Sequence, residues 1–327
     1  MYRTLKKYRK FLTKQQYKTI KGQITAGDLM GANKGLKRLL NRKKEGVKMQ
    51  PIKIIELFGG IGACTKAFKR LRIPYQVVDY VEIDKYAVSS YNAINETDFE
   101  PQDITTWNKD IEVDLIMHGS PCQDFSSAGL GKGADEGSGT RSSLMYETIR
   151  IVSKLKPKYV IWENVKNVIS KKHKHNFDNY INRLNDLGYT SYYQVLNAKD
   201  YGVPQNRERI FVISILGDHK PYVFPQKQKL KLRLQDLLES EVDESYYLDD
   251  ETTNKFIYDK VEKSEDYLNI KNANKKGYLE AKEGDSISLQ RPTSTTRRGR
   301  VGKQVSQTLQ TTNDMGVVVN DETTTIS

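Results

Sequence analysis

The residues His118-Gly119-Ser120-Pro121-Cys122-Gln123 directly follow the apolar run Val113-Asp114-Leu115-Ile116-Met117. A short apolar run of this kind predicts a buried strand, and the Pro-Cys step then places a thiol at its C-terminal end. Residues 124–143 are rich in glycine and serine without helical or strand periodicity, which predicts a mobile loop. A thiol on a rigid strand tip beside such a loop suits an active-site nucleophile, whereas a lone cysteine is otherwise a small core residue. The neighbouring motifs decide between these interpretations.

The composition limits the class of protein. The chain has 327 residues, enough for one large or two ordinary domains, and its 37% apolar content suffices for a core. The two cysteines, Cys64 and Cys122, are too few for a disulfide framework, so we expect a reducing, cytoplasmic environment. No apolar run approaches the ~20 residues of a membrane span. His173, His175 and His219 lack the spacing of metal ligands, so we expect no metal.

The positive charge of the chain is concentrated at its N-terminus. The net charge is +12, and residues 1–50 hold 15 Lys and Arg against two acidic residues, Asp28 and Glu45. The remaining residues hold 38 Lys and Arg against 39 Asp and Glu, so this body is nearly neutral. Two interpretations of the basic arm stay open: it binds nucleic-acid phosphates, or it is a solvated and partly disordered tail.

The arm is predicted to be helical in two pieces. Thr13 precedes a helix over Lys14–Lys21 as its expected N-cap, and Thr25 stands in the same position before Ala26–Leu40. Residues 43–46 read as a linker to the body. The domain organisation expected from these features is an arm over 1–50 followed by a larger body.

The body opens with a strand, a glycine turn and a helix. Residues 52–58 are apolar and predict a strand, Gly59-Gly60-Ile61-Gly62 is a tight turn, and residues 63–71 have helical spacing. This order begins many nucleotide-binding α/β sheets, because glycines let the backbone approach a ligand and the helix N-terminus favours a negative group. The third glycine of the dinucleotide fingerprint is missing, so the turn alone does not indicate NAD.

A second strand over residues 76–84 carries acidic residues at its end. Glu82 stands where a carboxylate binds ribose hydroxyls, and Asp84 is placed to cap a helix over 85–94. Asp103 ends the next segment, where it either accepts a hydrogen bond from an adenine amino group or serves as a turn residue.

The second half of the body repeats the pattern. Near-continuous apolar runs alternating with helices predict a parallel sheet covered on both faces, with ligands beyond the strand tips. Glu163 lies near the end of an apolar strand, and Arg207 and Arg209 stand two residues apart at a strand start, which suits an anion or an internal carboxylate such as Glu163. The further strands are predicted at 159–165, 191–196 and 210–215, and the helices at 143–155 and 177–187.

Six short motifs together resemble the DNA (cytosine-5)-methyltransferases of the bacterial and phage type. Each is weak alone, but they occur in the family's order and spacing over about residues 52–216. They are Glu56-Leu57-Phe58-Gly59-Gly60-Ile61-Gly62, Glu82-Ile83-Asp84, Asp103-Ile104-Thr105, Gly119-Ser120-Pro121-Cys122-Gln123, Glu163-Asn164-Val165 and Gln205-Asn206-Arg207-Glu208-Arg209.

This resemblance implies a fold, a cofactor and a reaction. The fold is a doubly wound, mostly parallel α/β sheet of the Rossmann-like methyltransferase kind. The reaction transfers a methyl group from S-adenosylmethionine to carbon 5 of cytosine in a specific duplex DNA sequence, with the base flipped out. Cys122 is implied as the nucleophile, and Glu163 as the residue that hydrogen-bonds the flipped cytosine. Arg207 and Arg209 match the family's arginines beside the catalytic centre. The cofactor-binding residues implied are Phe58, Gly60, Gly62, Glu82, Ile83, Asp103, Ile104, Pro121 and Leu144.

The resemblance also implies a domain organisation. Residues 51–219 form the catalytic domain, and residues 220–327 form a small, mostly irregular target-recognition region, in which the basic stretch 291–300 either contacts DNA or is a solvated loop. The family's segments after this region are not found, so we expect either a truncated chain or a second polypeptide that supplies them, on an otherwise monomeric protein. The alternatives to the main reading are a non-catalytic DNA-binding remnant and the same chemistry on RNA.

Overall fold

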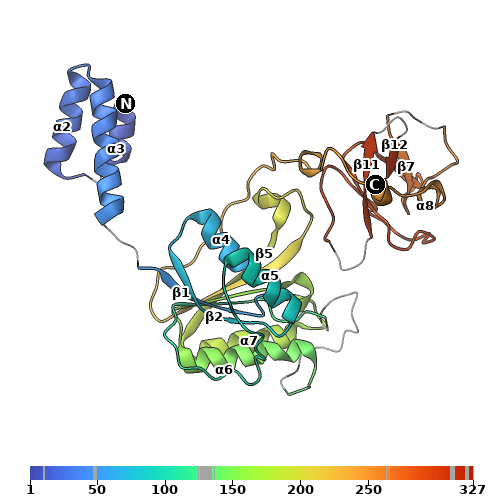
Figure 1. Ribbon diagram of the computed structural model, residues 1–327, viewed down its shortest axis with the longest axis horizontal. Coiled ribbons are helices and arrows are strands. Elements are labelled where there is room, and N and C mark those ends of the chain that lie inside the picture. The colour runs from blue at the N-terminus through green and yellow to red at the C-terminus, as the bar shows by residue number, and fades with distance from the viewer. Residues whose placement is uncertain are drawn as a thin grey trace. The chain divides into compact units, whose positions relative to one another are not determined.

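The computed structural model describes residues 1–9, 12–46, 50–123, 125, 135, 137–262, 264, 266–309, 314–320 and 324–326. Most of the loop predicted to be mobile after Cys122 therefore lies outside the described residues. Figure 1 shows a helical N-terminal arm, an α/β body and a C-terminal region of short strands. Among the described helices, none combines the length and the hydropathy that a membrane crossing requires.

A six-stranded sheet with the order β2-β1-β3-β4-β6-β5 forms the centre of the body. β1 and β3 pair in parallel, as do β3 and β4, whereas β6 runs antiparallel to both β4 and β5. The prediction of a mostly parallel sheet is confirmed for the first half, and the reversal of β6 is its main departure. The strands are β1 (Ile52–Leu57), β2 (Tyr75–Val81), β3 (Leu115–His118), β4 (Tyr159–Val165), β5 (Tyr189–Asn197) and β6 (Glu208–Leu216).

Helices cover both faces of this sheet. In Figure 1, α6 and α7 lie on the face opposite α5, which is the doubly wound arrangement that the sequence predicts. The carboxylate of Asp84 accepts hydrogen bonds from the backbone nitrogens of Tyr86 and Ala87, so its predicted role as the N-cap of α5 is confirmed. The helices of the body are α4 (Ala63–Leu71), α5 (Lys85–Asn95), α6 (Met145–Leu155) and α7 (Lys174–Asp186), with 3₁₀ turns at Arg141–Leu144, Lys166–Ile169 and Ala198–Tyr201.

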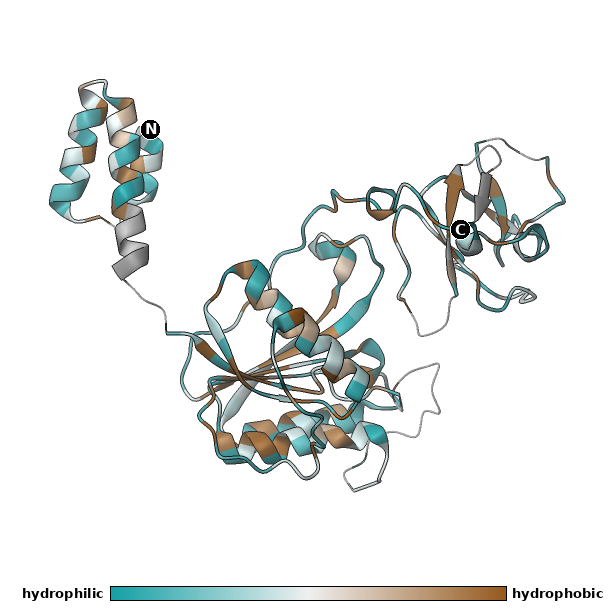
Figure 2. Ribbon diagram, viewed as in Figure 1, coloured by the Kyte–Doolittle hydropathy of each residue, from teal (hydrophilic) through white to brown (hydrophobic). Residues whose placement is uncertain are grey.

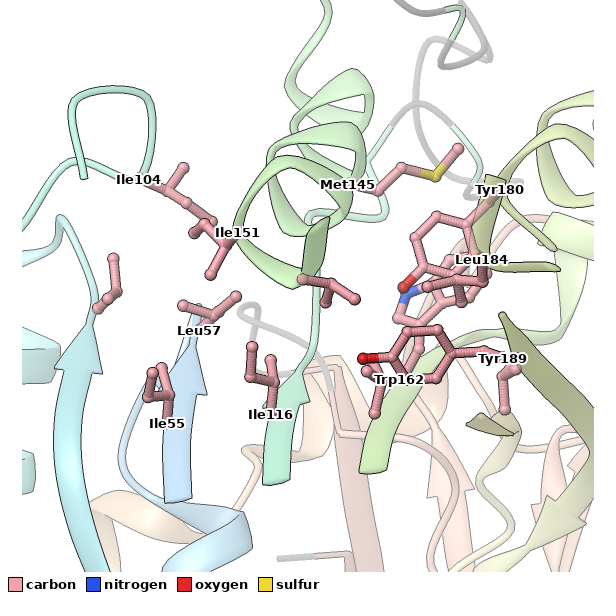
Figure 3. Close-up of a cluster of buried hydrophobic side chains, with 14 of the residues drawn as sticks. Ile55, Leu57, Ile104, Ile116, Met145, Ile151, Trp162, Tyr180, Leu184 and Tyr189 are labelled. Carbon is pink, nitrogen blue, oxygen red and sulfur yellow. The ribbon is translucent and has the colours of Figure 1, made fainter. Parts of the chain in front are cut away.

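The core of the body lies between the sheet and the α6–α7 layer. Figure 3 shows Ile116 of β3 and Trp162 of β4 pointing toward the side chains of Met145 and Tyr180. Trp162 is 1% exposed, and its ring centroid lies 4.4 Å from that of Tyr180. The apolar residues of α6 that supply this layer are also visible in Figure 2. This packing fixes β3 and β4, whose ends carry the Pro-Cys and Glu-Asn motifs.

The arm folds into three helices, α1 (Tyr2–Lys7), α2 (Lys14–Thr25) and α3 (Leu29–Gly46). Thr13 caps α2 through a capping box with Gln16, as predicted. The predicted cap of the second helix was wrong: Asp28 accepts from the Gly31 nitrogen, while the Thr25 hydroxyl donates to the Lys21 carbonyl within α2. The predicted linker over 43–46 is also wrong, because α3 extends through Gly46.

The C-terminal region contains more regular structure than predicted. Ile270, Ala281, Ile287 and Val318 form a small fully buried core between its sheets. The strands were missed because most of them have only two to four residues, which leaves no alternating pattern of useful length. They are β7 (Leu268–Lys271), β8 (Tyr278–Ala281), β9 (Ser286–Ser288), β10 (Val301–Gly302), β11 (Met315–Asn320) and β12 (Thr324–Ile326), preceded by α8 (Asp250–Asn254) and 3₁₀ turns at Gln235–Leu237 and Glu244–Tyr246.

The burial of β3 gives a stability prediction. Ile116 is 0% exposed, so Ile116→Ala should lower the free energy of unfolding by about 2–5 kcal/mol through lost burial and a residual cavity. Urea denaturation followed by tryptophan fluorescence measures this change. The control Val223→Ala, at a side chain that is 81% exposed, should change the free energy by less than about 0.5 kcal/mol. Equal effects of the two substitutions would contradict a core position for β3.

Candidate active site at the carboxyl edge of the sheet

A cavity of ≈ 380 Å³ lies where β2, β3 and β4 end and β6 begins. Its volume falls in the range of ligand sites, about 300–1,000 Å³. The cavity brings together all four residues predicted to be catalytic and most of those predicted to bind the cofactor. These lining residues are Phe58, Glu82, Ile83, Asp103, Ile104, Pro121, Cys122, Leu144, Glu163, Arg207 and Arg209. The two predicted glycines, Gly60 and Gly62, are not part of the lining, and they lie in the turn after β1.

The reversed direction of β6 explains how the arginines reach this edge. In the antiparallel pairing of β4 and β6, Val165 lies opposite Arg209 and Glu163 lies opposite Phe211. The start of β6 therefore meets the end of β4, at the edge where the parallel strands deliver their C-terminal residues. A parallel β6 would have placed Arg209 at the opposite edge of the sheet.

Glu163 and Arg209 form an ion pair inside the cavity. The Arg209 Nε lies 3.0 Å from the Glu163 Oε1, and both side chains are partly buried. Burial raises the pKa of Glu163, while Arg209 and then Arg207 oppose that rise. The net direction is upward, so this carboxyl holds a proton more readily than an ordinary glutamate. The prediction that the arginines serve an internal carboxylate is confirmed for Arg209.

The Cys122 thiol shares this electrostatic environment. Burial raises its pKa, Arg209 lowers it, and the Glu163 carboxylate raises it again. A Cβ placed on Gly119 would lie 3.7 Å from the Glu163 Oε2, so the carboxyl sits beside the backbone that leads to Cys122. The sulfur is therefore mostly a thiol near neutral pH, and the nearby guanidinium is the group that favours the thiolate.

Side chains of β4 hold the loop that carries Cys122. The Asn164 Nδ2 donates to the Ser120 carbonyl at 3.1 Å, and the Trp162 Nε1 donates to the Ser120 Oγ at 3.0 Å. Both contacts are buried, so breaking them would leave buried polar groups without hydrogen-bond partners. They fix the peptide two residues before the thiol. Sequence reasoning assigned Asn164 only the end of the strand, because its partner is 44 residues away.

His118 lies next to this loop but is not an acid–base group. It is 4% exposed, its Nε2 lies 2.7 Å from the Tyr180 hydroxyl oxygen, and burial lowers its pKa to about 3. It therefore stays neutral at physiological pH. Its ring stacks at 5.8 Å from that of Trp162 and contributes to the core beneath the site.

The turn after β1 approaches the end of β2 closely. Phe58, Gly60 and Gly62 all have positive φ, at 52°, 52° and 86°. A Cβ on Gly59 would lie 2.5 Å from the Tyr80 ring, which explains the glycine there, and the Tyr80 hydroxyl donates to the Gly60 carbonyl at 2.6 Å. The turn is thus shaped by close contact with β2, and a left-handed Phe58 is a strained conformation of the kind found at binding sites.

Three backbone amides orient the Glu82 carboxylate. The Gly60 nitrogen donates to its Oε2 at 3.1 Å, and the nitrogens of Ile83 and Asp84 donate to its Oε1 at 2.9 and 3.0 Å. A carboxylate has about four acceptor positions, so Glu82 keeps capacity for a further donor. Gly60, although outside the cavity lining, thus acts on the site through Glu82.

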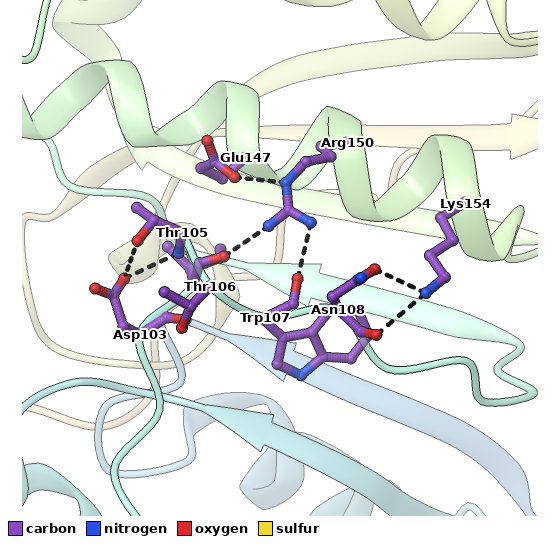
Figure 4. A network of polar contacts seen from close by, with 9 residues as sticks. Asp103, Thr105, Thr106, Trp107, Asn108, Glu147, Arg150 and Lys154 are labelled. Atoms are coloured by element: carbon purple, nitrogen blue, oxygen red, sulfur yellow. Dashed lines mark hydrogen bonds and ion pairs between the residues drawn. The ribbon is translucent and has the colours of Figure 1, made fainter.

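The segment that contains Asp103 is held from two sides. Asp103 accepts hydrogen bonds from the backbone nitrogen and hydroxyl of Thr105, its turn role, and it also lines the cavity. Figure 4 shows Arg150 of α6 donating to the carbonyls of Ile104 and Trp107, at 2.7 and 2.8 Å. Buried Asp79 of β2 accepts from the Trp107 indole on the other side, at 2.7 Å. The turn role of Asp103 is therefore confirmed, and its contact with an adenine amino group stays a prediction.

Arg141 is a cavity residue that sequence reasoning missed. It begins the 3₁₀ turn before α6 and lines the same cavity as Cys122. The signal was an arginine at the end of a glycine- and serine-rich stretch, but nothing in the local pattern indicates that the chain returns to the site there.

The basic stretch 291–300 turns out to stabilise its own region. Arg300 is 1% exposed and donates to the carbonyls of Lys271, Ser288, Gln290 and Arg291. Further contacts join Arg297 to the Ser288 hydroxyl and Arg298 to the Ala273 carbonyl. The solvated-loop interpretation is therefore wrong for Arg297 and Arg300, whereas Arg298 is exposed. DNA contact stays a prediction for the stretch.

The opposing charges near Cys122 predict its reactivity in the free protein. Glu163→Gln removes the group that raises the thiol pKa and should speed alkylation by iodoacetamide near neutral pH, whereas Arg209→Gln should slow it. Peptide mass spectrometry of the folded protein measures the rates. Cys64 is the internal control, because it is 8% exposed and burial raises its pKa strongly. Rates that move in the same direction in both variants would contradict this electrostatic picture.

Similar structures share the fold of this chain. Methyltransferase EhMeth of Entamoeba histolytica aligns with a TM-score of 0.52 and 19% identity, covering 64% of this chain and 68% of that one. A DNMT2 mutant of Spodoptera frugiperda aligns with a TM-score of 0.52 and 22% identity, covering 63% and 66%. At these identities the likeness supports the α/β fold alone.

Curated relatives match more closely in sequence. Type II methyltransferase M2.ScrFI of Lactococcus lactis subsp. cremoris is 36% identical over an alignment of 252 residues, and the match covers 60% of this chain and 70% of that protein. Type II methyltransferase M.SsoII of Shigella sonnei is 39% identical over 204 residues, 61% and 52% of the two chains. Orphan methyltransferase M.Rho11sI of Bacillus phage rho11s is 33% identical over 249 residues, 66% and 49%. The chain thus spans about half the length of the last two.

The family description "C-5 cytosine-specific DNA methylase" matches residues 52–325, which include the sheet, the cavity and the C-terminal region. This match, the shared fold and the motifs gathered around one cavity agree with one another. The chain belongs to the C-5 cytosine-specific DNA methylases.

Proposed function

We propose that this chain transfers a methyl group from S-adenosylmethionine to carbon 5 of cytosine in a specific duplex DNA sequence, through a covalent adduct of Cys122 with a flipped base. The observation that carries the proposal is that Cys122, Glu163, Arg207 and Arg209 line one cavity of ≈ 380 Å³ together with the predicted cofactor residues. A thiol, a carboxyl of raised pKa and two guanidinium groups are the parts that this chemistry requires.

The thiolate solves the central chemical problem of the reaction. Carbon 5 of cytosine is a poor nucleophile, but addition of the Cys122 sulfur to carbon 6 makes carbon 5 enamine-like. Carbon 5 would then form a bond to the electrophilic methyl group as the bond between that methyl group and the cofactor sulfur breaks, which releases S-adenosylhomocysteine. Loss of the carbon 5 proton to solvent, followed by cleavage of the sulfur–carbon bond, regenerates Cys122 and the aromatic ring. Because carbon 6 is inaccessible inside a base-paired stack, the base must be flipped out.

Glu163 makes the thiolate addition easier. A protonated carboxyl donates a hydrogen bond to the ring nitrogen of cytosine and so accepts the charge that develops on the ring. Burial raises the pKa of Glu163, which favours this form, while Arg209 opposes it. Arg209 has a second effect, since it also lowers the pKa of the Cys122 thiol. The Arg209 guanidinium therefore favours the reactive form of Cys122 and disfavours the protonated form of Glu163.

The cavity fits S-adenosylmethionine. The Glu82 carboxylate, oriented by three backbone amides, has acceptor capacity for ribose hydroxyls, and Asp103 offers an acceptor for an adenine amino group. Phe58, Ile83, Ile104 and Leu144 supply apolar lining. When bound, the cofactor supplies the electrophilic methyl group. The residues of this chain hold it near Pro121 and Cys122 on the same edge of the sheet.

The C-terminal region is the proposed site of target recognition. A larger hollow of ≈ 1360 Å³ lies there, lined by both polar and apolar side chains, including Arg297 and Gln307. The region also contacts the arginine motif directly: the Asn206 nitrogen donates to the Ser306 carbonyl at 2.7 Å, and the Thr308 hydroxyl donates to the Asn206 carbonyl at 3.0 Å. A change in the recognition region thus reaches the residue before Arg207.

The nucleophile is tested with DNA that contains 5-fluorocytosine. Fluorine at carbon 5 cannot leave as a proton, so the wild-type chain should remain covalently attached to the DNA after methyl transfer. Cys122→Ser should abolish both the adduct and methyl transfer, because a hydroxyl is a far weaker nucleophile, with DNA binding near wild type. Denaturing electrophoresis detects the adduct. Cys64→Ser is the matched control and should keep it. An adduct that persists in Cys122→Ser would exclude this residue.

A gel shift, the adduct assay and tritium transfer from labelled cofactor separate the alternatives. A non-catalytic DNA-binding remnant predicts a gel shift without any adduct or methyl transfer when cofactor is saturating. An RNA enzyme predicts transfer of tritium from labelled cofactor into tRNA rather than into duplex DNA.

The balance held by Arg209 predicts a pH dependence. Activity requires the Cys122 thiolate and the protonated Glu163. The fraction of thiolate falls at low pH and the fraction of protonated carboxyl falls at high pH, so kcat/KM should decline on both sides of an optimum. Arg209 lowers both pKa values, and its loss in Arg209→Gln should therefore move both limbs of the profile to higher pH. Arg209→Lys keeps the charge and should leave the limbs closer to wild type. Limbs that stay in place in Arg209→Gln would remove this role.

A further inference from the structure

The N-terminal arm is a packed helical unit rather than a tail. Leu5, Leu12, Ile20, Ala32 and Leu36 are each at most 9% exposed and form one apolar cluster between α1, α2 and α3. Gly35 permits this packing, because a Cβ there would lie 2.8 Å from the Ile20 Cδ1. The arm therefore presents a defined surface, and the partly disordered tail expected as one alternative is wrong for its described residues.

The charged side chains on that surface are almost all cationic. Among described residues 1–9 and 12–39, Asp28 is the one acidic residue. Its carboxylate accepts a hydrogen bond from the Gly31 nitrogen at the start of α3. Figure 2 shows hydrophilic residues along α2 and α3 beside the apolar residues of this cluster. The exposed cationic residues are Arg3, Lys6, Lys7, Arg9, Lys14, Lys18, Lys21, Lys34, Lys37 and Arg38.

The placement of these charges works against the arm's own stability. Lys14, Lys18 and Lys21 follow one another at intervals of four and three residues, so like charges neighbour each other along one face of α2. Neither α1 nor α2 has an acidic residue in its first turn, where a carboxylate would stabilise the helix dipole. Such repulsion is relieved when an anionic partner lies along the face.

We propose that the arm is a second DNA-binding surface, which contacts the phosphate backbone of duplex DNA without reading its sequence. The partner follows from charge and family: the body beyond residue 50 is nearly neutral, and the chain belongs to a family of DNA methylases. Lys14 and Lys21 are seven residues apart, about 10 Å along α2. Parallel to the duplex axis, this length matches the rise of about three phosphates of one strand at ~3.4 Å each. The arm thus supplies the long-range attraction for DNA that the body lacks.

The test uses the full chain and a duplex of A·T pairs alone, measured by fluorescence anisotropy over a range of KCl concentrations. This duplex contains no cytosine, so binding to it does not depend on methyl transfer. The combined variant Lys14→Gln, Lys18→Gln, Lys21→Gln should bind at least about tenfold more weakly at low salt. Its log–log salt slope should be shallower by ~0.9 for each lost contact, up to about 2.7 for three. The matched variant Lys14→Arg, Lys18→Arg, Lys21→Arg keeps the charge and should retain affinity and slope.

Three results would overturn the proposal. They are an unchanged slope in the glutamine variant, an equal loss of affinity in the arginine variant, and a Lys-dependent affinity for tRNA or anionic lipid vesicles that exceeds the affinity for the duplex. A failure of the proposed methyl transfer would appear elsewhere, as the absence of the 5-fluorocytosine adduct, and would leave this binding result intact.

Discussion

The contact between Arg209 and Glu163 sets the chemistry of the whole edge of the sheet. A carboxyl buried without a cation beside it would stay protonated. A carboxyl strongly paired with a guanidinium would instead be ionised and could not donate a proton. Here the nitrogen and oxygen lie 3.0 Å apart, and burial still outweighs the cation, because the pKa of Glu163 stays raised. The same guanidinium lowers the pKa of the Cys122 thiol, so it favours the charged form of both groups. This assists the thiolate and opposes the protonated carboxyl.

The sheet topology makes this contact possible. β1, β3 and β4 run in parallel and bring Phe58, Cys122 and Glu163 to one edge by their C-terminal ends. Arginines at the start of a strand reach that edge only if the strand runs the other way, as β6 does. The sequence predicts the strand over 210–215 correctly, but an apolar run carries no sign of its direction. The resemblance of the motifs, rather than periodicity, was what placed Arg207 and Arg209 beside Cys122 in advance.

Local patterns predicted local features well. The cap of α2 at Thr13, the cap of α5 at Asp84 and the strand of Glu163 all depend on a few adjacent residues, and each is confirmed. The features that sequence reasoning missed depend on distant partners. Asn164 bonds to a carbonyl 44 residues away, and Arg150 bonds to one 46 residues away. The start of α3 shows the same limit at short range: Thr25 and Asp28 are both good capping residues, and a local pattern does not distinguish them.

The division of charge along the chain separates affinity from specificity. Arg300 uses a buried guanidinium to hold four backbone carbonyls instead of a carboxylate, so the shape of the C-terminal region is fixed before any DNA arrives. Such preorganisation favours discrimination between sequences, because little ordering cost remains at binding. It contributes little attraction, since the arginine charge is hidden from solvent. Exposed lysines on the arm have the converse properties: their field reaches any phosphate, and they carry no information about bases. Under the two functions proposed above, a nearly neutral body joined to a cationic arm would scan DNA through one surface while the C-terminal region and the cavity respond to the target.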